Sequence, residues 1–175
     1  MANLIDNTYF WGELEIAGID TENNPIAEGK ATELIAYTTK YQPIVLKELL
    51  SPTVYDQFIG GLATEPIADK WKELRDMIVM TGSKTSPLAN YVYWKWIRGH
   101  VSYSSTSGEV IPTFENASLA SVNMKMIRAW NEAVEMWQDI VDFLTENEDV
   151  YECQANGADF TQFMSNHGKI NPIGI

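Results

Sequence analysis

The chain has 175 residues, a length that suits one domain, and 45% of them are hydrophobic, a normal share for a globular protein. It carries 24 acidic and 12 basic residues, and the resulting formal charge of −12 argues against binding nucleic acid phosphates over a broad surface. No stretch approaches the roughly 20 apolar residues that span a bilayer, and the first residues lack a signal-peptide pattern. The single cysteine, Cys153, excludes an internal disulfide and fits a reducing compartment. We therefore expect an intracellular protein with no membrane segment.

Residues 1–24 are predicted to form an extended N-terminal arm. The segment from Thr8 to Ile19 is short and aromatic, so it suits either a paired strand or a stretch lying in a groove. Gly12 and Gly18 weaken a helical interpretation of this segment.

Prolines mark the expected helix starts that follow. Asn24-Pro25, Ser51-Pro52, Glu65-Pro66 and Ser86-Pro87 each place a proline where a first helical residue would stand, and three of them follow a good capping residue. This repeated signal favours an all-α fold. The helices are expected over about 25–50, with a break near Gln42-Pro43, and over 52–59, 66–80 and 87–101.

Residues 102–116 are rich in Ser and Thr and are predicted to form a long loop, or a hairpin with residues 109–111 in one strand. The last helix is expected over 117–146, capped by Asn116 or Ser118. Its apolar side chains step by three or four residues: Leu119, Val122, Met126, Trp130, Ala133, Trp137, Ile140 and Leu144. Residues 25–151 are therefore predicted to form a bundle of four or five helices, and residues 152–175 an extended C-terminal tail.

The face of the last helix opposite its apolar stripe is acidic. It carries five carboxylates: Glu132, Glu135, Asp139, Asp142 and Glu146. The first three share one helical face and would suit a divalent ion, but the solvated face of an amphipathic helix is the simpler interpretation.

Catalytic patterns are missing from the sequence. His100 and His167 lie far apart, and neither belongs to a nucleophile motif or a zinc-ligand spacing. No phosphate-binding glycine loop occurs. The aromatic residues Tyr91, Tyr93, Trp94 and Trp96 would suit base stacking only with many cations around them, so core packing is the expected use. We expect no enzyme, no cofactor and no metal.

Three segments together resemble a known family. They are KYQPIVLKELLSPTVYDQFIGGL (40–62), YVYWKWIRGH (91–100) and the stretch ENASLASVNMKMIRAWNEAV (115–134). Over about residues 30–145 the chain resembles head–tail connector proteins of tailed phages, also called head-completion or adaptor proteins. The most distinctive residues of the resemblance are Tyr41, Pro43, Leu46, Leu50, Tyr55, Phe58, Glu115, Asn116, Trp130 and Asn131. Ser51-Pro52 stands where the resemblance leads us to expect a glycine-containing turn.

The resemblance implies a structural virion protein, assembled in the host cytoplasm, that forms a homo-oligomeric ring beneath the portal. The implied partners are the portal protein, tail or further connector proteins, and double-stranded DNA that passes through without sequence-specific binding. In such a ring the two arms would dock on neighbouring subunits through Phe10, Trp11, Phe160 and Phe163. The five carboxylates of the last helix would then line the channel.

Two other interpretations remain open at this point. The chain could be a soluble helical binding or regulatory module that offers its aromatic surface to one cellular partner. It could also be an enzyme that holds a metal on the acidic face, in which case it would bind divalent ions tightly.

Overall fold

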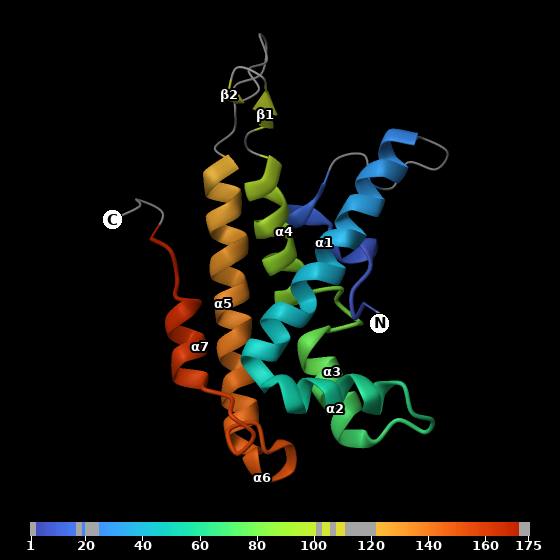
Figure 1. Cartoon of the computed structure of the whole chain (residues 1–175), viewed down its shortest axis with the longest axis vertical. Helices are drawn as coiled ribbons and strands as arrows, with labels where there is room; N and C mark the ends of the chain where they lie inside the picture. Colours follow the sequence, from blue (N-terminus) through green and yellow to red (C-terminus); the bar gives the residue numbers. More distant parts are fainter. Residues whose placement is uncertain are drawn as a thin grey trace.

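A computed structural model describes residues 3–16, 19, 25–100, 103–105, 108–110 and 122–171, with the side chains of 25–27, 103–105, 108–110, 122 and 123 left aside. Within these residues the chain is a helical bundle with one small hairpin (Figure 1), so the predicted all-α fold is confirmed. The elements are α1 (Pro25–Leu50), α2 (Pro52–Leu62), α3 (Asp69–Ile78), α4 (Pro87–His100), β1 (Tyr103–Ser105), β2 (Gly108–Val110), α5 (Val122–Glu146), α6 (Glu148–Tyr151) and α7 (Phe160–Asn166).

Three of the four proline starts are confirmed. Pro25, Pro52 and Pro87 are the first residues of α1, α2 and α4. Pro66 instead lies in the loop before α3, after a cis peptide bond from Glu65, and the helix begins only at Asp69. A proline serves a turn as readily as a first helical turn, which is why its presence alone did not fix this boundary.

The backbone at the junction between α1 and α2 explains why the resemblance led us to expect a glycine where this chain has Ser51. Ser51 has a φ of 76°, in the region that glycine enters most readily. Its hydroxyl accepts a hydrogen bond from the Val54 amide at 3.3 Å and so caps α2. The serine therefore provides a helix cap at the cost of an unfavourable backbone conformation.

The break predicted near Pro43 is wrong, because α1 continues through this proline. A proline inside a helix removes one backbone hydrogen bond and costs about 3 kcal/mol. The residues that follow it, Val45, Leu46, Leu49 and Leu50, are all fully buried. Burial of that face outweighs the cost of the proline.

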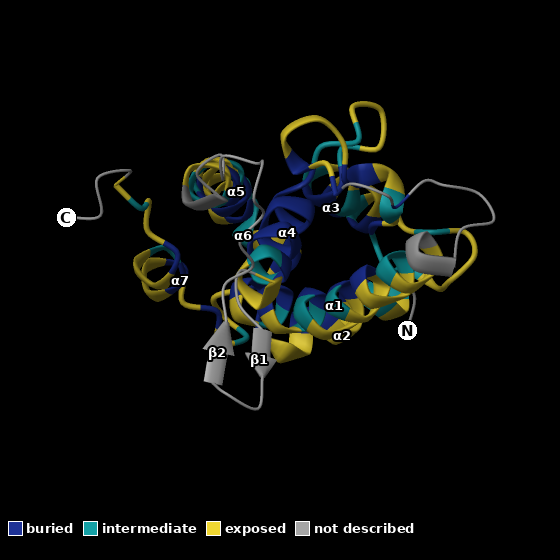
Figure 2. Cartoon of the chain, turned by 90° about the horizontal axis from the view of Figure 1, so that it is seen from above, coloured by how far each residue is buried: buried dark blue, intermediate teal, exposed yellow. Residues whose placement is uncertain are grey.

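Helix α4 is the centre of the bundle. It lies between α1 and α5 (Figure 2), and every residue from Pro87 to Trp94 is buried. This explains why α4 carries apolar and aromatic side chains on more than one face.

Helix α5 has 25 residues and is about 37 Å long at 1.5 Å per residue. In the described part of its predicted apolar stripe, Met126 is half-buried. The other residues are buried: Trp130, Ala133, Trp137, Ile140 and Leu144. Leu119 and the two proposed caps, Asn116 and Ser118, lie outside the described residues.

The predicted hairpin is present between α4 and α5. β1 pairs with β2 in antiparallel register, with Tyr103 opposite Val110. Figure 1 places this two-stranded ribbon beyond the ends of α4 and α5, at one end of the molecule. Ile111 and residues 112–116, which the prediction also included, lie outside the description.

Both terminal segments are more structured than the sequence indicated. Residues 3–16 form two short 3-10 turns, Asn7–Tyr9 and Gly12–Leu14. The segment predicted as an extended tail contains α7, capped by the Asp159 carboxylate, which accepts from the Gln162 amide at 2.8 Å. With α6 and α7 the described chain has seven α-helices instead of four or five. Phe160, Phe163 and Met164 have a helical spacing, but a helix of seven residues gives only a weak periodic signal.

Candidate functional site

The acidic face of α5 is exposed. The side chains of Glu132, Glu135, Asp139, Asp142 and Glu146 all lie on the solvent side of the helix, opposite its buried stripe. A single helix can place five carboxylates in a row in this way because residues three and four apart share a face. We call these five residues the acidic face.

Other side chains of the same molecule contact three of the five carboxylates of the acidic face. Glu132 accepts a hydrogen bond from the Asn90 amide at 2.9 Å. Glu135 pairs with Lys169 at 2.7 Å, and Asp142 accepts from Gln138 at 2.8 Å. The Lys169 pair is exposed, so it adds little stability. Among the described residues, no three His, Cys, Asp or Glu side chains gather closely enough to hold a metal ion.

Three of the four predicted contact anchors belong to the chain's own core. Phe10, Phe160 and Phe163 are buried against the bundle, so they cannot dock on a neighbouring subunit while the chain is folded. The reason is that the terminal segments fold back on α1, α4 and α5 and satisfy their apolar side chains there. Trp11 is different, because 58% of its surface is exposed.

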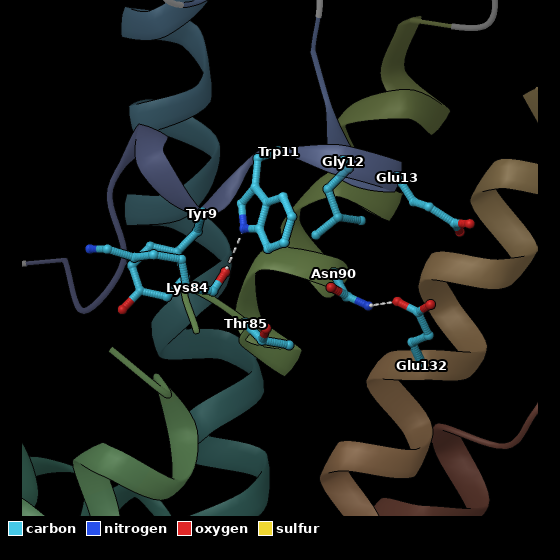
Figure 3. A pocket seen from close by; sticks show the side chains of 9 residues that line it. Tyr9, Trp11, Gly12, Glu13, Lys84, Thr85, Asn90 and Glu132 are labelled. Atoms are coloured by element: carbon cyan, nitrogen blue, oxygen red, sulfur yellow. Dashed lines mark hydrogen bonds between the residues drawn. The ribbon is translucent and has the colours of Figure 1, made fainter. Parts of the chain in front are cut away.

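Trp11 stands at a pocket of about 310 Å3 between the N-terminal segment, the start of α4 and α5 (Figure 3). Its indole N–H donates to the Lys84 carbonyl oxygen at 3.0 Å, which fixes the orientation of the exposed ring. Figure 3 shows Asn90 turned toward Glu132 on the other side of the pocket. Glu13 lines the same pocket, and its Oε1 lies 3.7 Å from the Nη1 of Arg128. We call Trp11, Glu13 and Glu132 the tryptophan face.

The aromatic residues of α4 pack in the core, as predicted. Tyr91, Tyr93, Trp94 and Trp96 are all buried. Trp94 lies against Trp130 of α5, with ring centroids 4.4 Å apart. Bases cannot stack on buried rings.

Above these rings lies a cluster of three cations. The Lys95 ammonium is 4.8 Å from the Trp94 ring centroid and 5.1 Å from that of Tyr91. The Arg98 guanidinium is 4.6 Å from the Trp94 centroid, and the Lys40 ammonium is 4.9 Å from that of Tyr41. Such contacts hold a charged group over an aromatic ring. We call Lys40, Lys95 and Arg98 the cation patch.

Burial shifts the pKa values of Lys95 in the cation patch and of Tyr91 beneath it. Burial lowers the pKa of Lys95, and the nearby Arg98 charge acts in the same direction. Burial also raises the pKa of Tyr91 to about 12, so the ring beneath Lys95 stays neutral at physiological pH. Lys95 and Arg98 lie beside these rings in the sequence, whereas Lys40 comes from another helix, α1.

Two residues that carry the resemblance hold the C-terminal segment against α5. The Trp130 indole N–H donates to the Gly168 carbonyl oxygen at 2.8 Å. The Asn131 side chain donates to the Ile170 carbonyl at 2.9 Å and accepts from the Ile170 amide at 2.8 Å. Both ends of one amide group are thus satisfied by one backbone residue.

The two histidines pack against aromatic rings, and the cysteine is buried. His100 is the last residue of α4, and its ring stacks on that of Trp96 with centroids 4.0 Å apart. His167 follows α7 and is buried with its ring 4.4 Å from that of Phe163. Burial raises the pKa of the Cys153 thiol to about 12, so it stays protonated and unreactive at neutral pH.

Comparisons with protein-family models, with curated proteins and with solved structures give no match. Among the described helices, none combines the length and the apolar character that crossing a bilayer requires.

Proposed function

We propose that this chain is a structural virion protein that forms a homo-oligomeric ring at the portal vertex of a tailed phage. The ring joins head to tail and lets double-stranded DNA pass through its centre. Its partners are the portal protein and tail or further connector proteins, and it assembles in the host cytoplasm. The sequence resemblance over about residues 30–145 is the first support for this proposal.

The acidic face of α5 is the structural observation that carries the proposal. Its five carboxylates are exposed along one rigid helix whose opposite side is fixed in the core. Repeated around a ring, they would form a negative band that repels the DNA backbone and limits friction. Salt screens such repulsion beyond about 8–10 Å, so the band would act only on DNA close to the wall.

The residues that carry the resemblance also support a structural role. Tyr55 and Phe58 are fully buried, and Trp130 and Asn131 hold the C-terminal segment in place. Residues with these roles shape a bundle and contribute no reactive group.

The proposal is tested by reversing charge on the part of the acidic face that makes no contact with the N-terminal segment or with Lys169. The test variant changes Asp139, Asp142 and Glu146 to Lys. A matched control changes three exposed carboxylates on other elements, Glu28, Glu65 and Glu73, to Lys, which alters the net charge equally. Both proteins are assembled with portal protein and viewed by cryo-electron microscopy, and virions that carry them are assayed for infectivity.

We expect rings in both cases, with residues 139, 142 and 146 facing the ring axis. The test variant should retain or eject DNA poorly, whereas the control should behave like the wild type. An outward-facing α5, or equal infectivity of the two variants, would contradict the proposed channel lining. Failure of the wild-type chain to associate with portal complexes would contradict the connector function itself.

A further inference from the structure

The cation patch is unusual for this strongly acidic chain because Glu48 is the one carboxylate among the described residues whose charge acts to raise the pKa of Lys95, and it forms no direct ion pair with it. Within the described part of the chain, Lys40, Lys95 and Arg98 form no ion pair with a carboxylate, although acidic residues outnumber basic ones two to one. Three neighbouring cations repel one another, and burial of Lys95 adds to that cost. An incoming carboxylate would relieve the repulsion.

The surroundings of the patch suit a protein partner. Ile44 lies one helical turn after Lys40 on α1, and 48% of its surface is exposed. Tyr41, between the two, is half-buried. An apolar centre with charges around it is typical of a protein–protein interface. The Tyr91 and Trp94 rings beneath Lys95 are buried, so they are not available for stacking on bases.

The tryptophan face has the complementary properties. Trp11 is a large aromatic side chain held in place by its bond to Lys84 and largely exposed, and tryptophan is enriched among the residues that dominate binding energy. Glu13 and Glu132 lie at the same pocket, where Glu13 pairs with Arg128 at 3.7 Å and Glu132 accepts from Asn90. Both carboxylates are exposed, so they can exchange these contacts for the cations of another molecule. Trp11 can pack on the exposed Ile44 or over a cation, while the carboxylates meet the remaining cations.

The two surfaces point in different directions on the same molecule. Asn90, which lines the tryptophan pocket, and Lys95, in the cation patch, are five residues apart on α4 and so about 140° apart around its axis. The surfaces share no residue, so a contact between them joins two copies head to tail. Such a contact repeats from copy to copy and closes into a ring when the rotation permits.

We propose that the tryptophan face of one copy docks on the cation patch of the next. This inference rests on the proposed ring and adds the pair of surfaces that builds it. Only Glu132 of the acidic face takes part, so Glu135, Asp139, Asp142 and Glu146 remain for the channel. A second copy is the favoured occupant because its tryptophan face brings two carboxylates to the three cations and an exposed aromatic ring to the exposed Ile44.

A charge swap on the full chain tests this pairing. Glu13→Lys and Arg98→Glu each change an exposed side chain, one on each surface. We expect each single variant to weaken self-association by about tenfold or more, and the double variant to regain most of the lost affinity because the swapped charges again attract. Trp11→Ala should abolish association as well. Lys72→Glu on α3, which lies on neither surface, is the control for altered charge.

The oligomer mass is measured by mass photometry, and circular dichroism verifies the fold of each variant. Singles that assemble like the wild type, or a double variant no better than the singles, would overturn the pairing while leaving the ring intact. Loss of DNA binding in Arg98→Glu with an unchanged oligomer mass would also overturn it, since the patch would then serve phosphates. A wild-type chain that stays monomeric even with portal complexes would refute both the pairing and the ring.

Discussion

The two terminal segments of the chain, residues 3–16 and 152–171, resemble each other in sequence character but differ in how they are held. Both send aromatic rings into one core. The C-terminal segment does so through a capped helix and polar bonds from Trp130 and Asn131. The N-terminal segment uses short 3-10 turns and leaves Trp11 exposed. The C-terminal segment is therefore part of the fold. The N-terminal segment both completes the core and offers the Trp11 ring to other molecules.

Deleting residues 152–175 should have the largest effect. The deletion removes Cys153, Phe160 and Phe163, which are all buried. A buried phenylalanine alone is worth about 3–5 kcal/mol, and a whole domain has a stability of only about 5–15 kcal/mol. We expect the truncated chain to lose its cooperative thermal transition in circular dichroism. A truncated chain that melts like the full one would show that the C-terminal segment is a dispensable arm.

Phe163→Ala should destabilise the chain by about 3–5 kcal/mol, because the side chain is fully buried against Trp137 and His167. Phe10→Ala tests the same effect in the N-terminal segment, where the ring is also buried. Urea denaturation measures both. A loss below about 1 kcal/mol at only one of the two sites would mean that only the other segment contributes to the core.

Asn131→Ala should cost about 1–3 kcal/mol, since both polar groups of Ile170 lose their partner. Because the site is half-buried, the lower end of that range is expected. Asn131→Asp keeps the acceptor and loses the donor, so it should fall between Ala and the wild type. Hydrogen exchange at the Ile170 amide reports the change locally, and unchanged protection in Asn131→Ala would contradict this role.

Ser51→Ala calibrates these effects at a site outside both terminal segments. It removes the cap on the Val54 amide and keeps the positive φ, so we expect a loss of about 1 kcal/mol. Ser51→Gly also loses the cap but relieves the backbone, and should cost less. Thermal denaturation of the two variants measures the difference in their stability. A glycine variant less stable than the alanine variant would refute the backbone argument.

Trp11→Ala should change stability least, by less than about 0.5 kcal/mol, because the ring is largely exposed. Its predicted effect is on assembly, where the Phe10→Ala variant is a poor comparison because it weakens the fold. Normal melting together with lost association would separate the role of Trp11 from that of its buried neighbour. A loss of stability comparable to that of Phe10→Ala would place Trp11 in the core.

Features confined to one helix could be predicted from the sequence. The buried stripe and acidic face of α5 follow from side chains three and four residues apart, and the Ser51 cap follows from its place before Pro52. The cation patch could not be predicted in the same way, because Lys40 and Lys95 are more than fifty residues apart and meet only when α1 packs on α4.

The terminal segments illustrate the same limit. Phe160, Phe163 and Met164 follow a helical spacing, and this local signal was available in the sequence. The burial of these side chains could not be predicted from the sequence, because it depends on α7 packing against α1 and α5. The spacing of side chains predicts an element, whereas its docking partner depends on the whole fold.

Mass photometry of the full chain, alone and with portal complexes, tests the proposed ring most directly. The account predicts a discrete species whose mass is a fixed multiple of the 19.8 kDa chain. It further predicts that Trp11→Ala abolishes this species while the monomer keeps its melting temperature. A chain that remains monomeric under both conditions would contradict the account.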